Sequence, residues 1–455
     1  MTRVITYGTF DLFHEGHRRI LERAREHGDH LTVGVTTEQY DEQRGKLNVR
    51  QSLMARIENV RASGLADEII IEERDGQKIT DIQKHGIDVF VIGSDWTGKF
   101  DHLASYCRVV YLDRTAGVSS TELRAADGGI LRLGIVGAGR IARRFVPESK
   151  YVSGVEAVGV CTPHRSSAEA FAAAHELSFA TTSYDDLLDR VDAVYIASPH
   201  DAHVPQTRAA LAAGKHVLCE KPIALTGADA EQLYALAADR GVVLLEAIKT
   251  AYSPGFVQMV ALARSGSIGE IRSVQATFTK LVEGNPRERH ADGGSTRELA
   301  SYPLLAIAKL LGTDVRDVQR DALTLPGSEI DDYARLTLRY DGAIGTAVVG
   351  LGVKAEGDLV AAGTAGYLYV PAPWWKAEAF ELRFEDPSRN RRYTSRFDGE
   401  GLRYELAEFL SLITHGRTSS YKLSAADSTF IASTLEQALA QPPLGAAPAP
   451  VAAIA

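Results

Sequence analysis

Cysteine is scarce in the 455-residue sequence, which contains only Cys107, Cys161 and Cys219. These positions match no metal-ligand spacing, and so few thiols are typical of a reducing compartment. The sequence also lacks an apolar run of about 18 residues, the length that a membrane-spanning helix needs. Its N-terminus has no signal-peptide pattern. We therefore expect a cytoplasmic protein without a membrane partner.

Excess positive charge is absent as well, since the formal net charge is -9. This excludes a broad basic surface for nucleic acid, so any anionic ligand must be held by local cations and backbone N–H groups. Apolar residues make up 45% and charged residues 24%, as in ordinary globular proteins. The length suggests about three compact units of roughly 150 residues each.

Two segments share one pattern, in which a β-rich strand leads through a glycine-containing turn into a helix. The first joins residues 3–8 to 17–25, and the second joins 131–137 to 140–145. Strands and helices alternate after each of them, which favours parallel sheets built from βαβ units. We predict an α/β chain with two Rossmann-like domains, at residues 1–126 and 130–250.

The alternation of strands and helices stops near residue 250. Successive strands are expected over 271–280, 333–340, 343–351, 359–362 and 367–370, with helices near 301–311 and 404–414. This pattern predicts an α+β domain over residues 251–440 with a large, mostly antiparallel sheet. The Ala- and Pro-rich residues 441–455 are expected to be disordered.

The segment GTFDLFHEGH places two histidines, His14 and His17, around Gly16 where the first strand hands over to a helix. A helix N-terminus offers free N–H groups and a positive dipole to a phosphate, and imidazoles can stabilise the charge that builds on it. Zinc binding is disfavoured, because the spacing differs from HExxH and no third ligand is evident. The remaining alternative is that both histidines only cap the helix.

This first block resembles the cytidylyltransferase family, and within it the glycerol-3-phosphate branch. GTFDLFHEGH matches the family's HxGH signature, residues 114–121 match RTxGxST, and residues 93–101 resemble GxDWxGKFD. The resemblance implies that a phosphate monoester attacks the α-phosphorus of CTP and releases pyrophosphate, with Mg²⁺ bridging phosphate oxygens. The family often has His at the position of Ala55, so the resemblance does not define the residues that bind the alcohol phosphate.

The resemblance also implies roles for individual residues. His14, His17, Lys46 and Arg114 would be catalytic. The CTP-binding set would be Gly8, Thr9, Phe10, His14, His17, Gly93, Asp95, Arg114, Ser119, Ser120 and Thr121. Lys46, Arg56, Trp96 and Lys99 would bind the substrate, although Trp96, Lys99 and Phe100 could instead be core and surface residues.

The second glycine-rich turn, GAGRIA at residues 137–142, follows an apolar strand and opens a helix. In this context GxGxxA predicts dinucleotide binding. The acidic residue that usually binds the ribose is missing, and Thr162 and Arg165 stand in that region instead. A hydroxyl and a cation suit a 2′-phosphate, so we favour NADP over NAD. The alternative for Arg165 is an exposed helix start.

Residues 131–440 resemble the Gfo/Idh/MocA oxidoreductase family through CEKPIAL at residues 219–225 and AVYIASPHDAH at 193–203. The resemblance implies that Lys221 touches the nicotinamide and the substrate. It also implies that Tyr302, in ELASYP, is the acid or base, the alternative being a tyrosine packed under the sheet. The implied cofactor-binding residues are Gly137, Gly139, Arg140, Ile141, Thr162, Arg165, Ser198, Pro199, His203, Glu220 and Lys221.

Together the two blocks predict a bifunctional enzyme that makes a CDP-activated polyol for a cell-wall polymer or capsule. Its oxidoreductase half would reduce a carbonyl phosphate, and its transferase half would add CMP to glycerol-3-phosphate or a pentitol phosphate. In an alternative sequence of steps, the CDP-alcohol forms first and is then oxidised by the second half. A third possibility is that one half only senses a nucleotide. We also expect a homo-oligomer.

Overall fold

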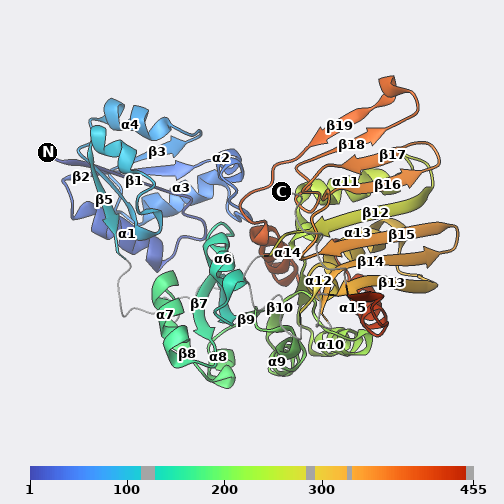
Figure 1. Ribbon diagram of the computed structural model, residues 1–455. Helices are drawn as coiled ribbons and strands as arrows, with labels where there is room; N and C mark the ends of the chain where they lie inside the picture. Colours follow the sequence, from blue (N-terminus) through green and yellow to red (C-terminus); the bar gives the residue numbers. More distant parts are fainter. Residues whose placement is uncertain (114–128, 283–292, 325–329, 447–455) are drawn as a thin grey trace, which may run out of the picture. The chain divides into compact units, whose positions relative to one another are not determined.

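The computed structural model describes residues 1–113, 129–282, 293–324 and 330–446 (Figure 1). The chain divides into two compact units, one formed by residues 1–134 and 143–192, the other by 135–142 and 193–455. Three sheets are described, and the boundary between the units passes through the second of them. None of the described helices is long and apolar enough to span a membrane.

The first sheet is parallel, with the strand order β3-β2-β1-β4-β5. Alternate residues of β1 point to opposite faces, so that Val4 packs in one apolar cluster and Ile5 in the other. The strand order reverses between β1 and β4, and ligands of doubly wound sheets bind at the carboxyl ends of strands at such a point. The elements are β1 Arg3–Gly8, α1 Glu15–Arg25, β2 His30–Thr36, α2 Glu38–Gln43, α3 Leu53–Ala62, β3 Glu68–Glu72, α4 Gln77–His85, β4 Val89–Gly93 and β5 Arg108–Leu112.

The second sheet has the order β11-β10-β9-β6-β7-β8. Its β7–β8, β9–β10 and β10–β11 pairings are parallel, and the order reverses between β6 and β9. This is the arrangement that the GxGxxA turn predicts. The elements are β6 Leu131–Val136, α6 Arg140–Ser149, β7 Val155–Cys161, α7 Arg165–His175, β8 Phe179–Thr181, α8 Tyr184–Asp189, β9 Ala193–Ile196, α9 His200–Ala212, β10 His216–Glu220, α10 Gly227–Arg240 and β11 Leu244–Ala247.

The third sheet has nine strands in the order β19-β18-β17-β16-β12-β15-β14-β13-β20. Its pairs are antiparallel except β12–β15 and β13–β20, as a mostly antiparallel sheet requires. Helix α13 packs on β12 and β15, and α15 packs on β13. The strands are β12 Ile271–Thr279, β13 Asp317–Thr324, β14 Asp331–Tyr340, β15 Ala343–Gly350, β16 Leu359–Gly363, β17 Tyr367–Val370, β18 Ala379–Arg383, β19 Arg391–Thr394 and β20 Gly445–Ala446. The helices are η3 Lys249–Tyr252, α11 Pro254–Arg264, α12 Ser295–Leu299, α13 Ser301–Leu311, α14 Leu402–Thr414 and α15 Ala425–Leu439.

The start of the Ala- and Pro-rich tail differs from the expected disorder. The side-chain amide of Gln441 donates to the carbonyl of Val318 (2.8 Å), and its oxygen accepts the N–H of Arg320 (2.8 Å). Residues 445–446 then pair with the end of β13. These bonds pair backbone N–H and C=O groups of β13, and the composition of the tail alone does not indicate this pairing. Residues 447–455 lie outside the described part of the chain.

Candidate functional sites

His14 and His17 sit at the start of α1, directly after the loop that leaves β1. His14 is the N-cap residue, and its Nδ1 accepts the N–H of Gly16 (3.1 Å). The N–H of His14 is in turn accepted by His17 Nδ1 (3.4 Å), and the two rings stack with centroids 3.8 Å apart. Because each Nδ1 is an acceptor, the proton of each neutral ring lies on Nε2. In each ring Nε2 is therefore the atom whose N–H could be directed at a phosphate.

A cavity of about 960 Å³ gathers several of the predicted transferase residues. Its lining includes Thr9, His14, His17, Lys46 and Gly93. Residues between 146 and 178 of the same compact unit also line it, and there Lys46 Nζ donates to the carbonyl of Lys150 (2.9 Å). Burial lowers the pKa of Lys46 to about 8, with the charge of Asp41 opposing the shift. The cavity thus combines imidazole N–H groups with an ammonium, as a triphosphate requires.

Arg56 corrects the sequence prediction, which placed it on the substrate. The residue is fully buried, and its guanidinium donates to the carbonyls of Thr9 and Thr36, both at 2.8 Å. A buried ion pair with Asp41 (3.6 Å) balances its charge. Arg56 therefore fastens the loop after β1 from inside the domain and has no face for a ligand. The sequence could not show this, because the local residue pattern of helix α3 does not indicate whether its arginine side chain is buried or exposed.

The remaining residues predicted for the transferase site divide into three groups. Gly8 ends β1, and Phe10 is buried in the apolar core. Trp96 packs on Phe100, while the exposed Lys99 lies over the Trp96 ring at 4.5 Å. Both the substrate role and the core-and-surface alternative for this pair stay open. Arg114, Ser119, Ser120, Thr121 and the side chain of Asp95 lie outside the described residues.

Gly137 begins the turn after β6 with φ +96, a conformation that L side chains rarely adopt. A Cβ at this position would lie 2.6 Å from the carbonyl oxygen of Ala197, so only glycine fits. Thr162 follows β7, and Arg165 begins α7 with its side chain exposed and paired with Glu169 (3.4 Å). The other predicted turn residues, Gly139, Arg140 and Ile141, lie at the start of α6.

Lys221 lies in the turn after β10 and contacts the α12 segment. Its Nζ donates to the backbone carbonyl of Glu298 (2.9 Å) and lies 4.0 Å from the Glu298 carboxylate. The other oxygen of this carboxylate lies 3.9 Å from Nδ1 of His200, the first residue of α9, whose N-cap is Pro199. Burial, and then the charge of Lys221, lower the pKa of His200 to about 2, so this imidazole is neutral. The family resemblance implies that His200 lies in an active-site loop near the nicotinamide, whereas Glu298 was absent from the predicted site although it opens ELASYP.

Tyr302 lies one helical turn after Glu298, at the start of α13. Its ring meets Phe278 edge to face with centroids 5.0 Å apart, and Phe278 stacks on Trp375 at 3.9 Å. Burial, and then the charge of Glu220, raise the pKa of Tyr302, which keeps its hydroxyl protonated. All three aromatic residues are half-buried. The structure therefore brings Tyr302 close to the residue that contacts Lys221 and adds an aromatic wall to this region.

The buried side chains of His203 and Glu220 form hydrogen bonds with other parts of the protein. The fully buried imidazole of His203 lies between the carbonyls of Ser198 (3.0 Å) and Pro222 (2.8 Å). Glu220 is also buried, and its carboxylate accepts the hydroxyl proton of Tyr195 at 2.6 Å. The polar atoms of both side chains are thus engaged with the protein itself. These contacts fix the surrounding backbone and β9, and the contact of both residues with a cofactor stays a prediction.

The chain resembles known proteins in both blocks. The family model described as cytidylyltransferase-like matches residues 5–126. The model described as an oxidoreductase family with an NAD-binding Rossmann fold matches 131–247, and the GFO/IDH/MocA C-terminal domain matches 256–369. Glycerol-3-phosphate cytidylyltransferase of Bacillus spizizenii is 51% identical over 124 residues, which are 27% of this chain and 95% of that protein.

The second block also has curated and solved relatives. The dTDP-3,4-didehydro-2,6-dideoxy-alpha-D-glucose 3-reductase of Streptomyces antibioticus is 33% identical over 269 residues, 56% of this chain and 80% of that protein. The chain joins a cytidylyltransferase to a Gfo/Idh/MocA oxidoreductase. A 3-ketoreductase from Actinomadura kijaniata, solved with NADP and TDP-benzene, has the same fold as the oxidoreductase part, with a TM-score of 0.62 and 24% identity over 70% of this chain and 99% of that chain.

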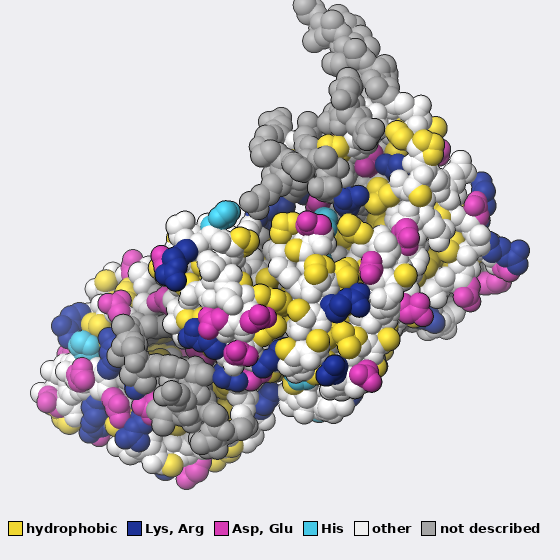
Figure 2. Space-filling view, turned by 90° about the horizontal axis from the view of Figure 1, so that it is seen from below, with side chains coloured by type: hydrophobic (Ala, Val, Ile, Leu, Met, Phe, Trp, Pro, Cys, Tyr) yellow, Lys and Arg dark blue, Asp and Glu magenta, His cyan; other side chains and the backbone are white. Residues whose placement is uncertain are grey.

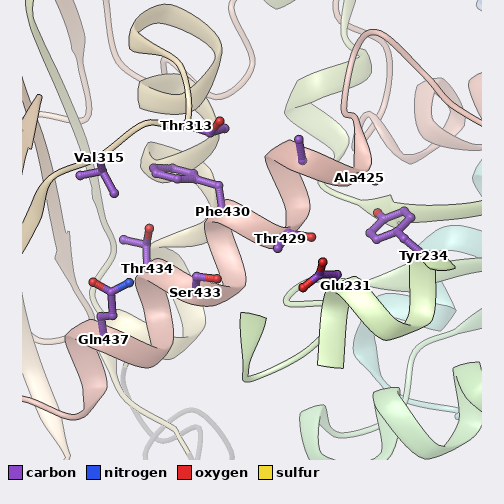
Figure 3. Close-up of a pocket in the computed structure, with 11 residues that line it drawn as sticks. Glu231, Tyr234, Thr313, Val315, Ala425, Thr429, Phe430, Ser433, Thr434 and Gln437 are labelled. Atoms are coloured by element: carbon purple, nitrogen blue, oxygen red, sulfur yellow. The ribbon is translucent and has the colours of Figure 1, made fainter. Parts of the chain in front are cut away.

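A second cavity lies in the oxidoreductase part, away from Lys221 and Tyr302. This groove of about 480 Å³ runs between α10 and α15, as Figure 3 shows with Tyr234 on the first helix and Phe430 on the second. It contains none of the residues predicted for catalysis or cofactor binding.

The surface carries charges of both signs, and Figure 2 shows Lys and Arg interspersed with Asp and Glu over the face in view. Among the described residues, no group of three His, Cys, Asp or Glu side chains is placed to hold a metal ion.

Proposed function

We propose that this chain makes a CDP-activated polyol. The cytidylyltransferase moves CMP from CTP to a polyol phosphate, either glycerol-3-phosphate or a pentitol phosphate, and releases pyrophosphate. The oxidoreductase uses NADPH to reduce a carbonyl phosphate and so supplies that polyol phosphate. The observation that carries the proposal is the fusion itself, with a glycerol-3-phosphate cytidylyltransferase relative at 51% identity and an intact pair of imidazoles at α1.

The transferase mechanism rests on positioning and charge neutralisation. His14 and His17 would donate from Nε2 to phosphate oxygens of CTP, while Lys46 would neutralise the α-phosphate or the attacking phosphate. Each group stabilises charge that develops on the transferred phosphoryl group. Mg²⁺, when bound with CTP, would supply positive charge that offsets the charge of the phosphates. Arg114, Ser119, Ser120 and Thr121 are proposed from the family signature to hold the triphosphate.

The oxidoreductase residues fit a dinucleotide. Gly137 leaves room above the β6 turn where a pyrophosphate lies in such folds, and Thr162 and Arg165 offer a hydroxyl and a cation to a 2′-phosphate. NADPH would supply the hydride. Lys221, held by the Glu298 carbonyl, would orient the substrate carbonyl, and the protonated hydroxyl of Tyr302 would donate the proton.

Pyrophosphate release tests the transferase. The chain should release pyrophosphate from CTP in the presence of Mg²⁺ and glycerol-3-phosphate or a pentitol phosphate. If no alcohol phosphate raises the release above background, the transferase proposal fails. NADPH oxidation with a panel of carbonyl phosphates tests the other half, and binding of NADPH without turnover on any substrate would favour a sensor.

The oxidoreductase relatives favour the alternative sequence of steps, in which CMP transfer comes first and oxidation follows. The Streptomyces antibioticus relative is named for a dTDP-linked sugar, so the oxidoreductase here could act on a CDP-linked alcohol after CMP transfer. Mass spectrometry after incubation with CTP, glycerol-3-phosphate and NADP⁺ separates the two orders. A CDP-alcohol that loses two hydrogens supports oxidation after transfer, whereas an unchanged CDP-alcohol supports reduction before it. Light scattering would test the proposed homo-oligomer.

A further inference from the structure

The carboxyl group of Glu246 is a buried titratable group that the chemistry above does not use. Glu246 lies on β11 and is fully buried. Its Oε1 accepts the N–H of Ile223 (2.9 Å), and the Ser428 hydroxyl also interacts with the carboxylate. Ile223 stands two residues after Lys221, so this bond fixes the far end of the turn that carries the lysine.

Three contacts tie this turn to elements other than β10, and they differ in their capacity to change charge. Nζ of Lys221 binds the Glu298 carbonyl, and the His203 ring binds the Pro222 carbonyl. Two carboxylates accept backbone N–H groups of the turn, Glu246 that of Ile223 (2.9 Å) and Glu220 at the end of β10 that of Lys221 (3.3 Å), and such charge-assisted bonds are roughly twice as strong as neutral ones. A change in the ionisation of Glu246 therefore changes the strength of one of the three contacts.

Burial raises the pKa of Glu246 to about 7, and the negative charge of Glu220 adds to the shift. The Ser428 hydroxyl, the Ile223 N–H and the charge of Lys221 oppose it. The carboxyl group thus changes its charge in the neutral range, where an ordinary glutamate is fully ionised.

We propose that Glu246 is a positioning residue, whose carboxylate holds the Lys221 turn in place for NADPH and whose protonation loosens that turn. The proposal rests on the oxidoreductase assignment but does not depend on the identity of the substrate. Cofactor binding by the oxidoreductase would therefore change as the pH passes through the neutral range, although the proton donor, Tyr302, does not titrate there.

Other titratable groups surround Glu246, and most of them stay neutral near pH 7. Burial raises the pKa of Cys219, Tyr234 and Tyr252, so these groups keep their protons. Glu220 also has a raised pKa, chiefly through burial, and is the group that could mimic Glu246. The titratable and charged groups on the surrounding elements are Cys219, Glu220 and Lys221 at the end of β10, Tyr234 on α10, Tyr252 on η3, and Glu405 on α14.

Two variants separate the hydrogen bond from the charge. E246Q keeps an oxygen for the Ile223 N–H but cannot ionise, whereas E246L removes both. E408Q is the matched control, since Glu408 is another buried glutamate but binds Ser420 and Lys422 away from the turn. E220Q identifies any contribution from Glu220.

NADPH affinity, followed by cofactor fluorescence, and amide exchange of residues 219–226, followed by mass spectrometry, are measured from pH 6 to pH 8.5. Relative to E246Q, the wild type should gain several-fold in affinity and in protection of this segment as pH rises through 7. E408Q should behave as the wild type, and E246L should have the weakest protection at every pH.

The same pH dependence in the wild type and in E246Q would overturn the proposal, as would a response that only E220Q removes. The comparison of the wild type with E246Q stands even if E246L fails to fold, because E246Q preserves the shape of the side chain. If none of the proteins binds NADPH, the oxidoreductase assignment fails, but amide exchange still decides whether Glu246 holds the turn.

Discussion

Lys221 donates a hydrogen bond from Nζ to the backbone carbonyl of Glu298 across 2.9 Å. This bond links the turn after β10 to the helical segment that continues to Tyr302, so two predicted catalytic groups from distant parts of the sequence share one support. We expect Lys221→Met to lower NADPH oxidation by about 10²–10³-fold, because a charge that stabilises the developing alkoxide is lost. Pyrophosphate release should be unchanged, and Lys215→Met should leave both activities intact. An equal loss of both activities would contradict the assignment.

Replacing Gly137 should remove cofactor binding while leaving the fold intact. Gly137→Ala places a Cβ 2.6 Å from the Ala197 carbonyl oxygen at φ +96. A left-handed conformation costs a non-glycine residue about 1–2 kcal/mol, so NADPH affinity, measured by fluorescence titration, should fall about tenfold or more. Gly214→Ala is the control, because Gly214 also has a positive φ (+70) but a Cβ there meets nothing within 4 Å. Equal affinity in the two variants would show that the turn does not carry the cofactor.

The two roles of His14 can be separated by substitution. His14→Asn keeps a side chain that caps α1 but removes the imidazole N–H, whereas His14→Ala removes both. We expect both variants to lose pyrophosphate release by about 10²–10³-fold, and only the alanine variant to lose about 1 kcal/mol of helix-cap stability. An asparagine variant with full activity would reduce His14 to a capping residue. Thermal melting of both variants supplies the stability comparison.

Much of the fold was predictable, because it depends on periodicity and on turn glycines. The helix expected over residues 301–311 matches α13, and the strand expected over 367–370 matches β17. Strand β13 was not predicted, because Arg320 and Thr324 occupy buried positions of DVQRDALT and interrupt the alternation of polar and apolar side chains. Its place in the sheet comes from β14 and β20 on its two sides, which are tertiary contacts that no local pattern encodes.

The candidate sites were less predictable than the fold. Motifs gave His14, His17 and Lys221, since spacing around glycine and the EKP signature are local. Burial decided the rest, and it turned Arg56 from an expected substrate ligand into a structural residue. Glu298 was missed because its contact with Lys221 joins residues 77 positions apart in sequence.

Arg56 should matter for stability more than for chemistry. Arg56→Met leaves Asp41 buried without this partner and leaves the carbonyls of Thr9 and Thr36 without their donors. Removing one partner of a buried ion pair costs about 3–5 kcal/mol, so the temperature at which pyrophosphate release is lost should fall clearly. Arg61→Met, at an exposed position of the same helix α3, is the control. An unchanged inactivation temperature with a raised KM for the polyol phosphate would restore the substrate-binding role.

The pKa of Lys46 predicts the alkaline limit of the transferase. Burial lowers this pKa to about 8, and the ammonium is the form that can neutralise a phosphate. Below pH 8 the side chain is protonated, and as pH rises through 8 the cation and the activity are lost together. Lys46→Arg keeps its charge throughout this range, because arginine loses its proton only above pH 12. Pyrophosphate release measured from pH 6 to 10 should therefore decline near pH 8 in the wild type and extend to higher pH in the arginine variant, even if its maximal rate is lower. A decline at the same pH in both proteins would assign the alkaline limit to another group and leave Lys46 without this role.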